Sequence, residues 1–154
     1  MTMRHWQTGV AAVLALTLLS VSFGQAQDTS KRKTDIQVLA IRATNKNTEI
    51  SPELKEIADE LKKQFKFTGF KLEKRATGSA GIDEAFKTPL LEGWEARVTP
   101  KENDTKRVKL QIEIAKGKDK PDSATVTVPL GKFQLMGGQK LENGDSLIVA
   151  VAGR

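Results

Sequence analysis

Two hydrophobic periods alternate along this chain of 154 residues. From Ser51 to Lys66 apolar residues recur every three or four positions, the period of a helix with one buried face. Ser51 stands where an N-cap is favoured, and Pro52 follows at the first helical position. The stretch predicts an amphipathic helix of about 16 residues, roughly 24 Å long. Its apolar face would consist of Leu54, Ile57, Ala58, Leu61 and Phe65.

The second period is two, which is typical of strands with one buried face. Segments 35–43 and 146–152 are apolar at both odd and even positions, which favours central places in a sheet. The small residues of 76–81 predict a turn, 82–87 fits a short strand or a helical turn, and Asn143-Gly144 predicts a hairpin turn. Strands are expected at 35–43, 67–73, 93–99, 107–114, 125–130, 133–136 and 146–152.

The order of these elements predicts an α+β fold. One strand comes first, then the helix, then short strands joined by turns. We therefore expect one amphipathic helix packed on a mostly antiparallel sheet of about six to seven strands, in a single domain covering residues 35–154.

The first 26 residues have the three parts of a secretory signal peptide. A short basic head contains Arg4, an apolar run covers 9–23, and Gly24 to Ala26 supplies small residues for cleavage. A membrane anchor is the alternative, but the apolar run is shorter than the ~20 residues a spanning helix needs. We expect residues 1–26 to be cleaved, residues 27–34 to form a flexible lead-in, and the protein to be periplasmic or secreted.

The composition excludes several kinds of chemistry. The only histidine, His5, lies in the predicted signal peptide, and the chain has no cysteine. Catalytic triads that use histidine, cysteine–histidine pairs and the common zinc and copper sites are therefore absent from the mature chain. The sequence contains no nucleotide-binding fingerprint. We predict no catalytic, cofactor-binding or metal-ligating residue, and no cofactor. An exported domain without cysteine also favours a bacterial source.

A hydrolase remains an alternative. Two carboxylate pairs, Asp59/Glu60 and Asp83/Glu84, are candidates for acid–base work. Neighbouring residues on a helix do not face each other, so Asp59 and Glu60 are expected on the solvated surface. A serine–lysine pair that uses Ser79 or Ser123 is a further option, without a recognisable motif. Another alternative is an inhibitor of a secreted enzyme, presenting a loop from a rigid sheet.

Two segments suggest binding. Basic residues alternate with phenylalanines after the helix, a composition found in sites for anionic polymers or acidic partners, although core packing of the phenylalanines explains the pattern too. Residues 131–144 contain a glycine pair beside apolar residues, which fits an ordinary hairpin connection, a bulge, or a sheet edge that could accept a partner's strand. The predicted face for an anionic partner consists of Lys62, Lys63, Lys66, Lys71, Lys74 and Arg75.

The mature chain resembles small exported bacterial proteins of unknown function. The resemblance rests on VLAIRAT (38–44), SPELKEIADELKKQFKFTGFKL (51–72) and GGQKLENGDSLIVAVAG (137–153), and it implies no activity. The last stretch alone also resembles the closing β-hairpins of outer-membrane secretins. The sequence thus predicts an uncharacterised exported protein, a non-enzymatic binding module of the bacterial envelope, with an envelope protein or an anionic polymer as partner.

Overall fold

The computed structural model describes residues 32–154, which form eight strands, one α-helix and two 3-10 helices. The predicted signal peptide and residues 27–31 of the predicted lead-in lie outside the described residues. The strands are β1 (Thr34–Thr44), β2 (Gly69–Ala80), β3 (Phe86–Pro89), β4 (Trp94–Asn103), β5 (Arg107–Lys116), β6 (Asp122–Pro129), β7 (Phe133–Lys140) and β8 (Ser146–Gly153).

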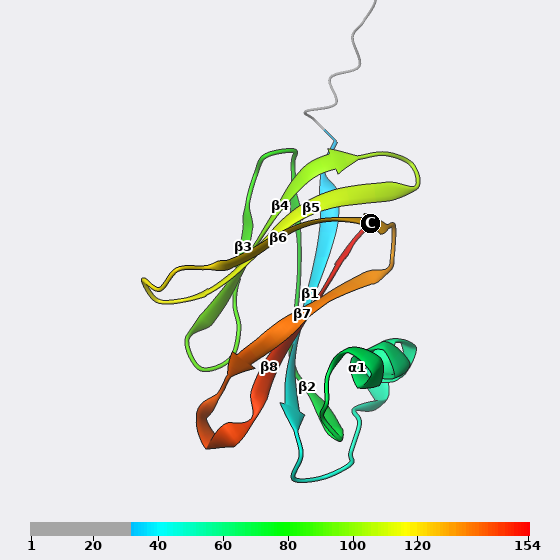
Figure 1. Cartoon of the computed structure of the whole chain (residues 1–154). Helices are drawn as coiled ribbons and strands as arrows, with labels where there is room; N and C mark the ends of the chain where they lie inside the picture. The colour runs from blue at the N-terminus through cyan, green and yellow to red at the C-terminus, as the bar shows by residue number, and fades with distance from the viewer. Residues whose placement is uncertain (1–31) are drawn as a thin grey trace, which may run out of the picture.

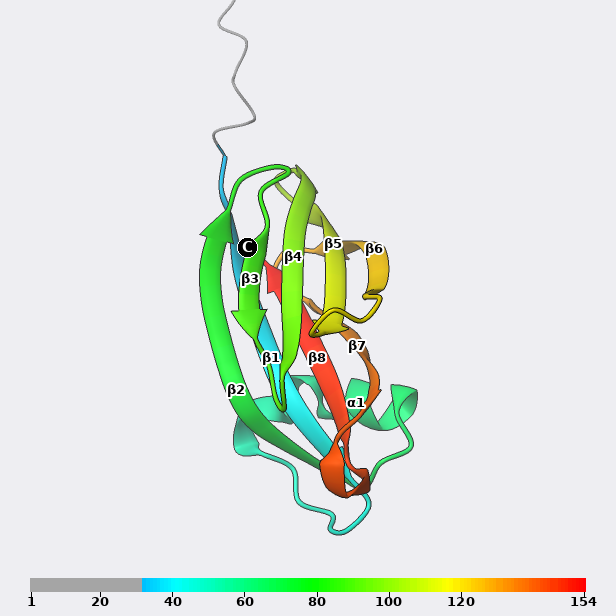
Figure 2. The same cartoon turned by 90° about the vertical axis from the view of Figure 1, so that its left-hand side faces the viewer.

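The strands form two antiparallel sheets of four rather than one larger sheet, so the predicted fold class is wrong. The first sheet, called sheet A, has the order β2-β1-β8-β7, and sheet B has the order β3-β4-β5-β6. The two sheets pack face to face as a β-sandwich, with the short helical segment against the other face of sheet A (Figures 1 and 2). The protein is mostly β, in three layers.

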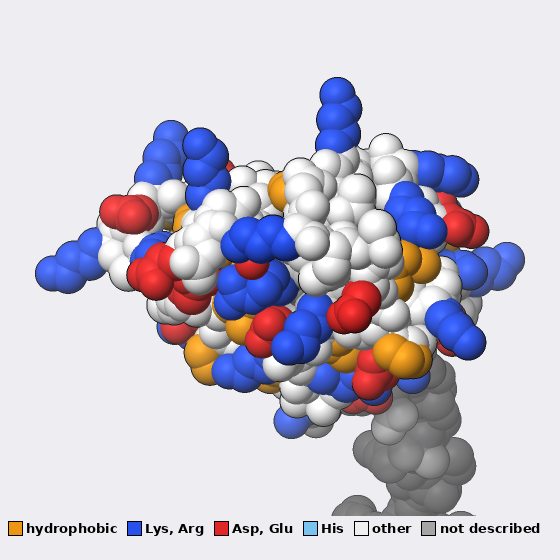
Figure 3. Space-filling view, turned by 90° about the horizontal axis from the view of Figure 1, so that it is seen from below, with side chains coloured by type: hydrophobic (Ala, Val, Ile, Leu, Met, Phe, Trp, Pro, Cys, Tyr) orange, Lys and Arg blue, Asp and Glu red, His pale blue; other side chains and the backbone are white. Residues whose placement is uncertain are grey.

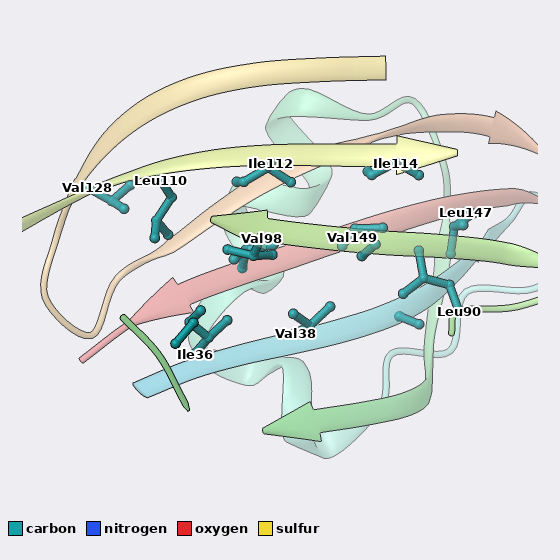
Figure 4. Packing of buried hydrophobic residues seen from close by; sticks show 14 of the residues in the cluster. Ile36, Val38, Leu90, Val98, Leu110, Ile112, Ile114, Val128, Leu147 and Val149 are labelled. Carbon is teal, nitrogen blue, oxygen red and sulfur yellow. The ribbon is translucent and has the colours of Figure 1, made fainter. Parts of the chain in front are cut away.

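The core of the sandwich lies between the inner faces of the two sheets. Alternate residues of β4 and β5, including Val98, Leu110 and Ile112, are at most 1% exposed and meet Val149 and its neighbours from sheet A. Figure 4 shows these side chains converging between the ribbons. The clean alternation of 107–114 in the sequence correctly predicted this half-buried strand, because one face of β5 stays in solvent.

The predicted long helix is instead a 3-10 helix, η2 (Pro52–Ile57), followed by the short helix α1 (Ala58–Gln64). The Ser51 hydroxyl makes no capping bond. Its Oγ accepts a hydrogen bond from the Leu72 amide of β2, at 2.9 Å. Ser51 therefore stands at the N-cap position, as predicted, but its side chain ties the helical segment to β2 instead of capping it. The predicted apolar face is nevertheless buried, because Leu54, Ile57 and Leu61 pack on sheet A.

Two glycine segments that suggested breaks are part of strands. The predicted turn 76–81 is largely the second half of β2, paired with β1 as far as Ala80. A Cβ atom at Gly78 would lie 2.2 Å from the ring of Phe86, so the glycine gives β3 room beside β2. Gly138, at a φ of 101°, is the extra residue of a bulge in β7, and the strand continues beyond it to Lys140.

The central strands of sheet A are buried on both faces, as predicted. Every residue of β8 is buried, and β1 pairs with it along most of its length. Ile148 faces the helical layer, whereas Val149 faces sheet B. The Asn143-Gly144 turn before β8 is also confirmed, with φ values of 68° and 79°.

Candidate functional site

Two regions bring together exposed chemistry in residues 32–154: a hollow at one end of the sandwich and the free edge of β6. The hollow has a volume of about 570 Å³ and lies beside the 45–50 loop, at the lower end of Figure 1. Phe70 and Ile50 contribute apolar surface, and Arg42, Lys46 and Asp145 contribute charge. Figure 3 views this end, where basic and acidic side chains intermingle around apolar ones.

The loop beside this hollow is tied to β2. Phe70 donates its amide to the Glu49 carbonyl at 2.8 Å, and the Thr68 hydroxyl donates to the carbonyls of Asn47 and Thr44 at 2.5 and 3.3 Å. A Cβ atom at Gly69 would lie 2.3 Å from the Asn47 side chain, so this close approach requires glycine. The hollow is therefore already formed in the isolated chain.

Arg42 is the centre of an ion network at this end. Its Nε lies 3.2 Å from Glu73, and its Nη1 lies 3.5 Å from both Glu92 and Asp145. Lys46 extends the network, because its Nζ lies 3.6 Å from Asp145 and donates to the Asn143 carbonyl at 2.8 Å. The guanidinium thus joins β1 and β2 of sheet A to the β3–β4 loop and to the turn before β8.

The network favours the charged forms of Asp145 and Arg42. For Asp145, burial works to raise the pKa, but a hydrogen bond from Thr44 and the positive charges of Lys46 and Arg42 outweigh it, so the pKa lies below its usual value. The pKa of Arg42 is raised, since its bond to Glu73 and the three carboxylates outweigh its partial burial. A carboxylate held ionised cannot serve as a general acid near neutral pH, so the network acts as a structural clamp.

The six basic residues of the predicted anionic-partner face lie on several elements. Lys62 and Lys63 are on α1, Lys66 follows it, and all three are exposed. The other three are on β2, and its pairing with β1 places them on two sides of sheet A. Arg75 is opposite Leu39 of the helix-side core, whereas Lys74 and Lys71 are opposite Ala40 and Arg42 on the other side.

The candidate hydrolase residues are not brought together. Asp83 pairs with Lys101 at 2.9 Å, and Glu84 accepts from the Gly81 amide at 3.1 Å. Ser79 donates to Asp35 beside it on β1, and Ser123 lies on β6 in the other sheet. Asp59 and Glu60 are exposed on α1. Within residues 32–154 no group of three or more histidine, cysteine, aspartate or glutamate side chains could hold a metal ion.

The second region is the free edge of sheet B, formed by β6. This strand pairs with β5 on one side without a register shift and is last in the order of its sheet (Figure 2). Between Asp122 and Pro129 it reads SATVTV, with no charged residue, and its last four side chains are all β-branched. It is a regular, exposed strand of high β-propensity, which is the type of edge that accepts another strand.

One hydrogen bond shows which backbone amides of β6 bond to β5 and which point away from it. Leu130 donates to the Lys106 carbonyl at 3.0 Å, so this directly opposed pair is a hydrogen-bonded pair of the β5–β6 ladder. Such pairs alternate in antiparallel sheets, so Val126 and Val128 also bond to β5. The amides and carbonyls of Ser123, Thr125 and Thr127 therefore point away from β5, toward the side on which no strand of residues 32–154 pairs with β6.

The other three edge strands carry features that discourage pairing. Strand β3 has four residues and contains Pro89, and β7 is kinked by its glycine bulge. Strand β2 carries several charged side chains, and Glu73 is an extra residue relative to β1. Charge, proline, shortness and bulges are the usual protections of an edge. Strand β6 begins with Asp122 and ends with Pro129, but none of these features occurs in the six residues between them.

Comparisons with known proteins do not identify a family. No protein-family model matches the chain, and no curated protein matches it. One solved structure is similar, that of the T2SS secretin XcpQ from Pseudomonas aeruginosa, with 13% identity and a TM-score of 0.30. The match covers 79% of this chain but only 55% of the secretin chain. At that TM-score the likeness supports no argument about fold or function. No helix in residues 32–154 is long and apolar enough to span a membrane.

Sequence reasoning missed both regions. The network draws its charges from five separate segments, and nothing near Arg42 in the sequence marks Glu92 or Asp145 as its partners. The strand 125–130 was predicted, and its lack of charge was visible. Its place at the edge was not, because the split into two sheets was not foreseen. The edge that the sequence suggested, 131–144, contains β7, which is an edge strand but a bulged one.

Proposed function

We propose that this chain is an exported, non-enzymatic binding module of the bacterial envelope that holds an extended segment of a partner protein against β6. The observation that carries the proposal is the row of outward amides and carbonyls at Ser123, Thr125 and Thr127, on a regular and uncharged edge. A segment added there would continue the ladder of sheet B, as in other cases of strand addition.

Electrostatics favours a different protein over a second copy as the partner. Antiparallel pairing of two β6 strands would bring the 118–120 loop of one copy, with two lysines, beside Lys132 of the other. The whole chain also carries a net charge of +6, so copies repel one another. A partner with acidic groups avoids both the local repulsion between lysines and the repulsion between two positively charged chains.

The interactions of the ionisable side chains also support a binding function over a hydrolase. Four ionisable side chains of the hollow, those of Arg42, Lys46, Lys71 and Asp145, belong to the ion network. The candidate acid–base residues lie apart from one another. The hydrolase alternative needs convergent groups with tuned pKa values, and the charged groups described above neutralise each other instead.

A proline scan of the edge tests the proposal. Proline at Thr125 removes an outward amide without touching a bond to β5, and edge strands tolerate proline at such positions. A photo-crosslinking residue is placed at Thr127 in the exported protein, and T125P is compared with T125A in cells. We expect a crosslinked partner with the unmodified edge and with T125A, and its loss with T125P. The same crosslinks with all three proteins would refute strand addition at β6.

A further inference from the structure

The surroundings of β6 define the chemistry of the segment it holds. This step rests on the proposed function and deepens it. Side chains of β6 alternate between the sandwich core and the outer face of sheet B, so an added strand would alternate in the same way. Each of its two faces would meet a different environment.

The core-facing side of the edge is apolar. Val126 and Leu130 are half-buried on this side of the sandwich, and Met136 of β7 packs against the same core. Residues of an added strand opposite Ala124 and Val126 would lie over this partly open core. Apolar side chains at these alternate positions would remove Val126 and Leu130 from water.

The outer face beside the edge is basic toward the C-terminal end of β6. Register places Lys109 opposite Thr127 and Arg107 opposite Pro129, with Lys106 and Lys132 in the adjoining connections. Lys109 has one partner, Glu102 at 3.4 Å. Among the described residues, Lys106, Arg107 and Lys132 form no ion pair.

The other end of the edge is balanced in charge. Glu113 lies opposite Ser123 and is paired with Arg97 at 3.8 Å, and Asp122 accepts from Gln139 at 2.8 Å. The Lys118 and Lys120 side chains adjoin Asp119 and Asp122 in the sequence. Around Pro129 the basic residues Lys106, Arg107, Lys109 and Lys132 outnumber the nearby acidic residues, Asp104 and Glu102. Acidic side chains would therefore be attracted to this end of the edge.

From these two faces we propose that the segment bound at β6 is an extended acidic peptide in which apolar and acidic residues alternate. Its apolar residues cover Val126 and Leu130. Its carboxylates are outward, nearest to Arg107 and Lys132. The free amides and carbonyls of Thr125 and Thr127 supply the backbone bonds.

The test uses two labelled eight-residue peptides with blocked ends, one alternating valine with glutamate and one alternating valine with lysine. Titration into the protein at low salt is followed by fluorescence anisotropy. We expect the glutamate peptide to bind at least tenfold more tightly than the lysine peptide. Its affinity should fall on adding salt, because the attraction is screened.

Two variants separate the backbone from the charge. T125P should abolish binding of the glutamate peptide, while T125A retains it. The double variant R107E/K132E should reverse the preference toward the lysine peptide, while K87E/K140E, which changes two lysines on other edge strands by the same charge, should not. Circular dichroism confirms that each variant is folded.

The possible outcomes are distinguishable. If both peptides bind equally and T125P abolishes the binding of both, the acidic preference is overturned and strand addition at β6 stands. If the glutamate peptide binds and T125P does not weaken its binding, both the acidic preference at β6 and strand addition are overturned. The peptide would then be held by charge alone, without backbone bonds to β6. Binding of neither peptide would overturn the inference about the segment, while the crosslinking comparison would still decide the proposed function.

Discussion

Sheet A and sheet B have four strands each but differ in how their surfaces are covered. Sheet A is enclosed by sheet B on one face and by the helical layer on the other, so β8 is apolar and buried throughout. Sheet B is covered on one face only, and β5 alternates strictly between core and solvent. Sheet A is thus covered on both faces, whereas sheet B leaves one face and the edge strand β6 open to solvent.

Truncating residues in each sheet tests this difference in how the two sheets are covered. Ile148→Ala in β8 should destabilise the fold by about 2–5 kcal/mol, since it leaves a cavity under the helical layer. Ile112→Ala should cost a similar amount, because it faces the same sandwich core as Val149. Gln111→Ala, on the open face of sheet B, should change stability by no more than about 0.5 kcal/mol. Urea unfolding measures all three.

That experiment also has a clear negative outcome. If Ile148→Ala and Gln111→Ala cost the same, the helical layer does not cover sheet A in solution, and the proposed division between the sheets is lost.

The second prediction concerns the clamp that joins both sheets at the hollow. Arg42→Met should cost about 1–3 kcal/mol, because three carboxylates lose their shared cation while the side chain is only 24% exposed. Lys71→Met is the matched control, since its Nζ is 3.9 Å from Glu73 and its side chain is 72% exposed. The control should change stability by less than about 0.5 kcal/mol. Equal losses in thermal unfolding would contradict a network centred on Arg42.

The third prediction is the pH dependence of the same clamp. The pKa of Asp145 is lower in the folded protein than the ordinary value of 3.8 for an aspartate. Its contribution is therefore present above that value and is lost as the pH falls through the lower folded pKa. Asp145→Asn should flatten the acid side of the stability curve, measured by urea midpoints from pH 6 down to pH 2. Asp104, whose pKa is lowered by bonds from the Lys106 and Arg107 amides, should still contribute its own acid dependence.

The smallest expected effect is at the edge itself. Thr125→Pro should change the free energy of unfolding by less than about 1 kcal/mol, because the amide it removes has no partner in the fold. Val126→Pro one residue later removes a bond to β5 and should cost about 3 kcal/mol or more. The difference between these two neighbours measures which side of β6 is paired. Comparable losses would mean that the ladder is out of phase with the one described.

The sequence predicted local features well and their assembly poorly. The two-sided apolar pattern of 146–152 correctly predicted a central strand, and Leu54, Ile57 and Leu61 were correctly placed on one buried face. The division into two sheets depends on pairings such as Ile36 with Gly153, across almost the whole domain, which a local pattern does not encode. For the same reason the free edge of β6 could not be recognised, since an edge is defined by the strand that is missing beside it.

Glycine residues were the other reason why strand boundaries were predicted incorrectly. The small residues 76–81 have the composition of a turn, but Gly78 is there to admit the Phe86 ring. For the pair Gly137-Gly138 a strand break and a bulge were both considered, and the structure has the bulge, with β7 continuing beyond it. In both cases a tertiary contact or pairing, which the sequence alone does not show, overrides the local tendency of glycine to break strands.

Amide hydrogen exchange along β6, followed by NMR in the free protein, tests the central claim most directly. We expect slow exchange at Ala124, Val126 and Val128, which bond to β5, and fast exchange at Ser123, Thr125 and Thr127. Adding the valine–glutamate peptide should slow the three fast amides selectively. Uniform slow exchange along β6 in the free protein would show that the edge is already paired, and the proposed binding site would not exist.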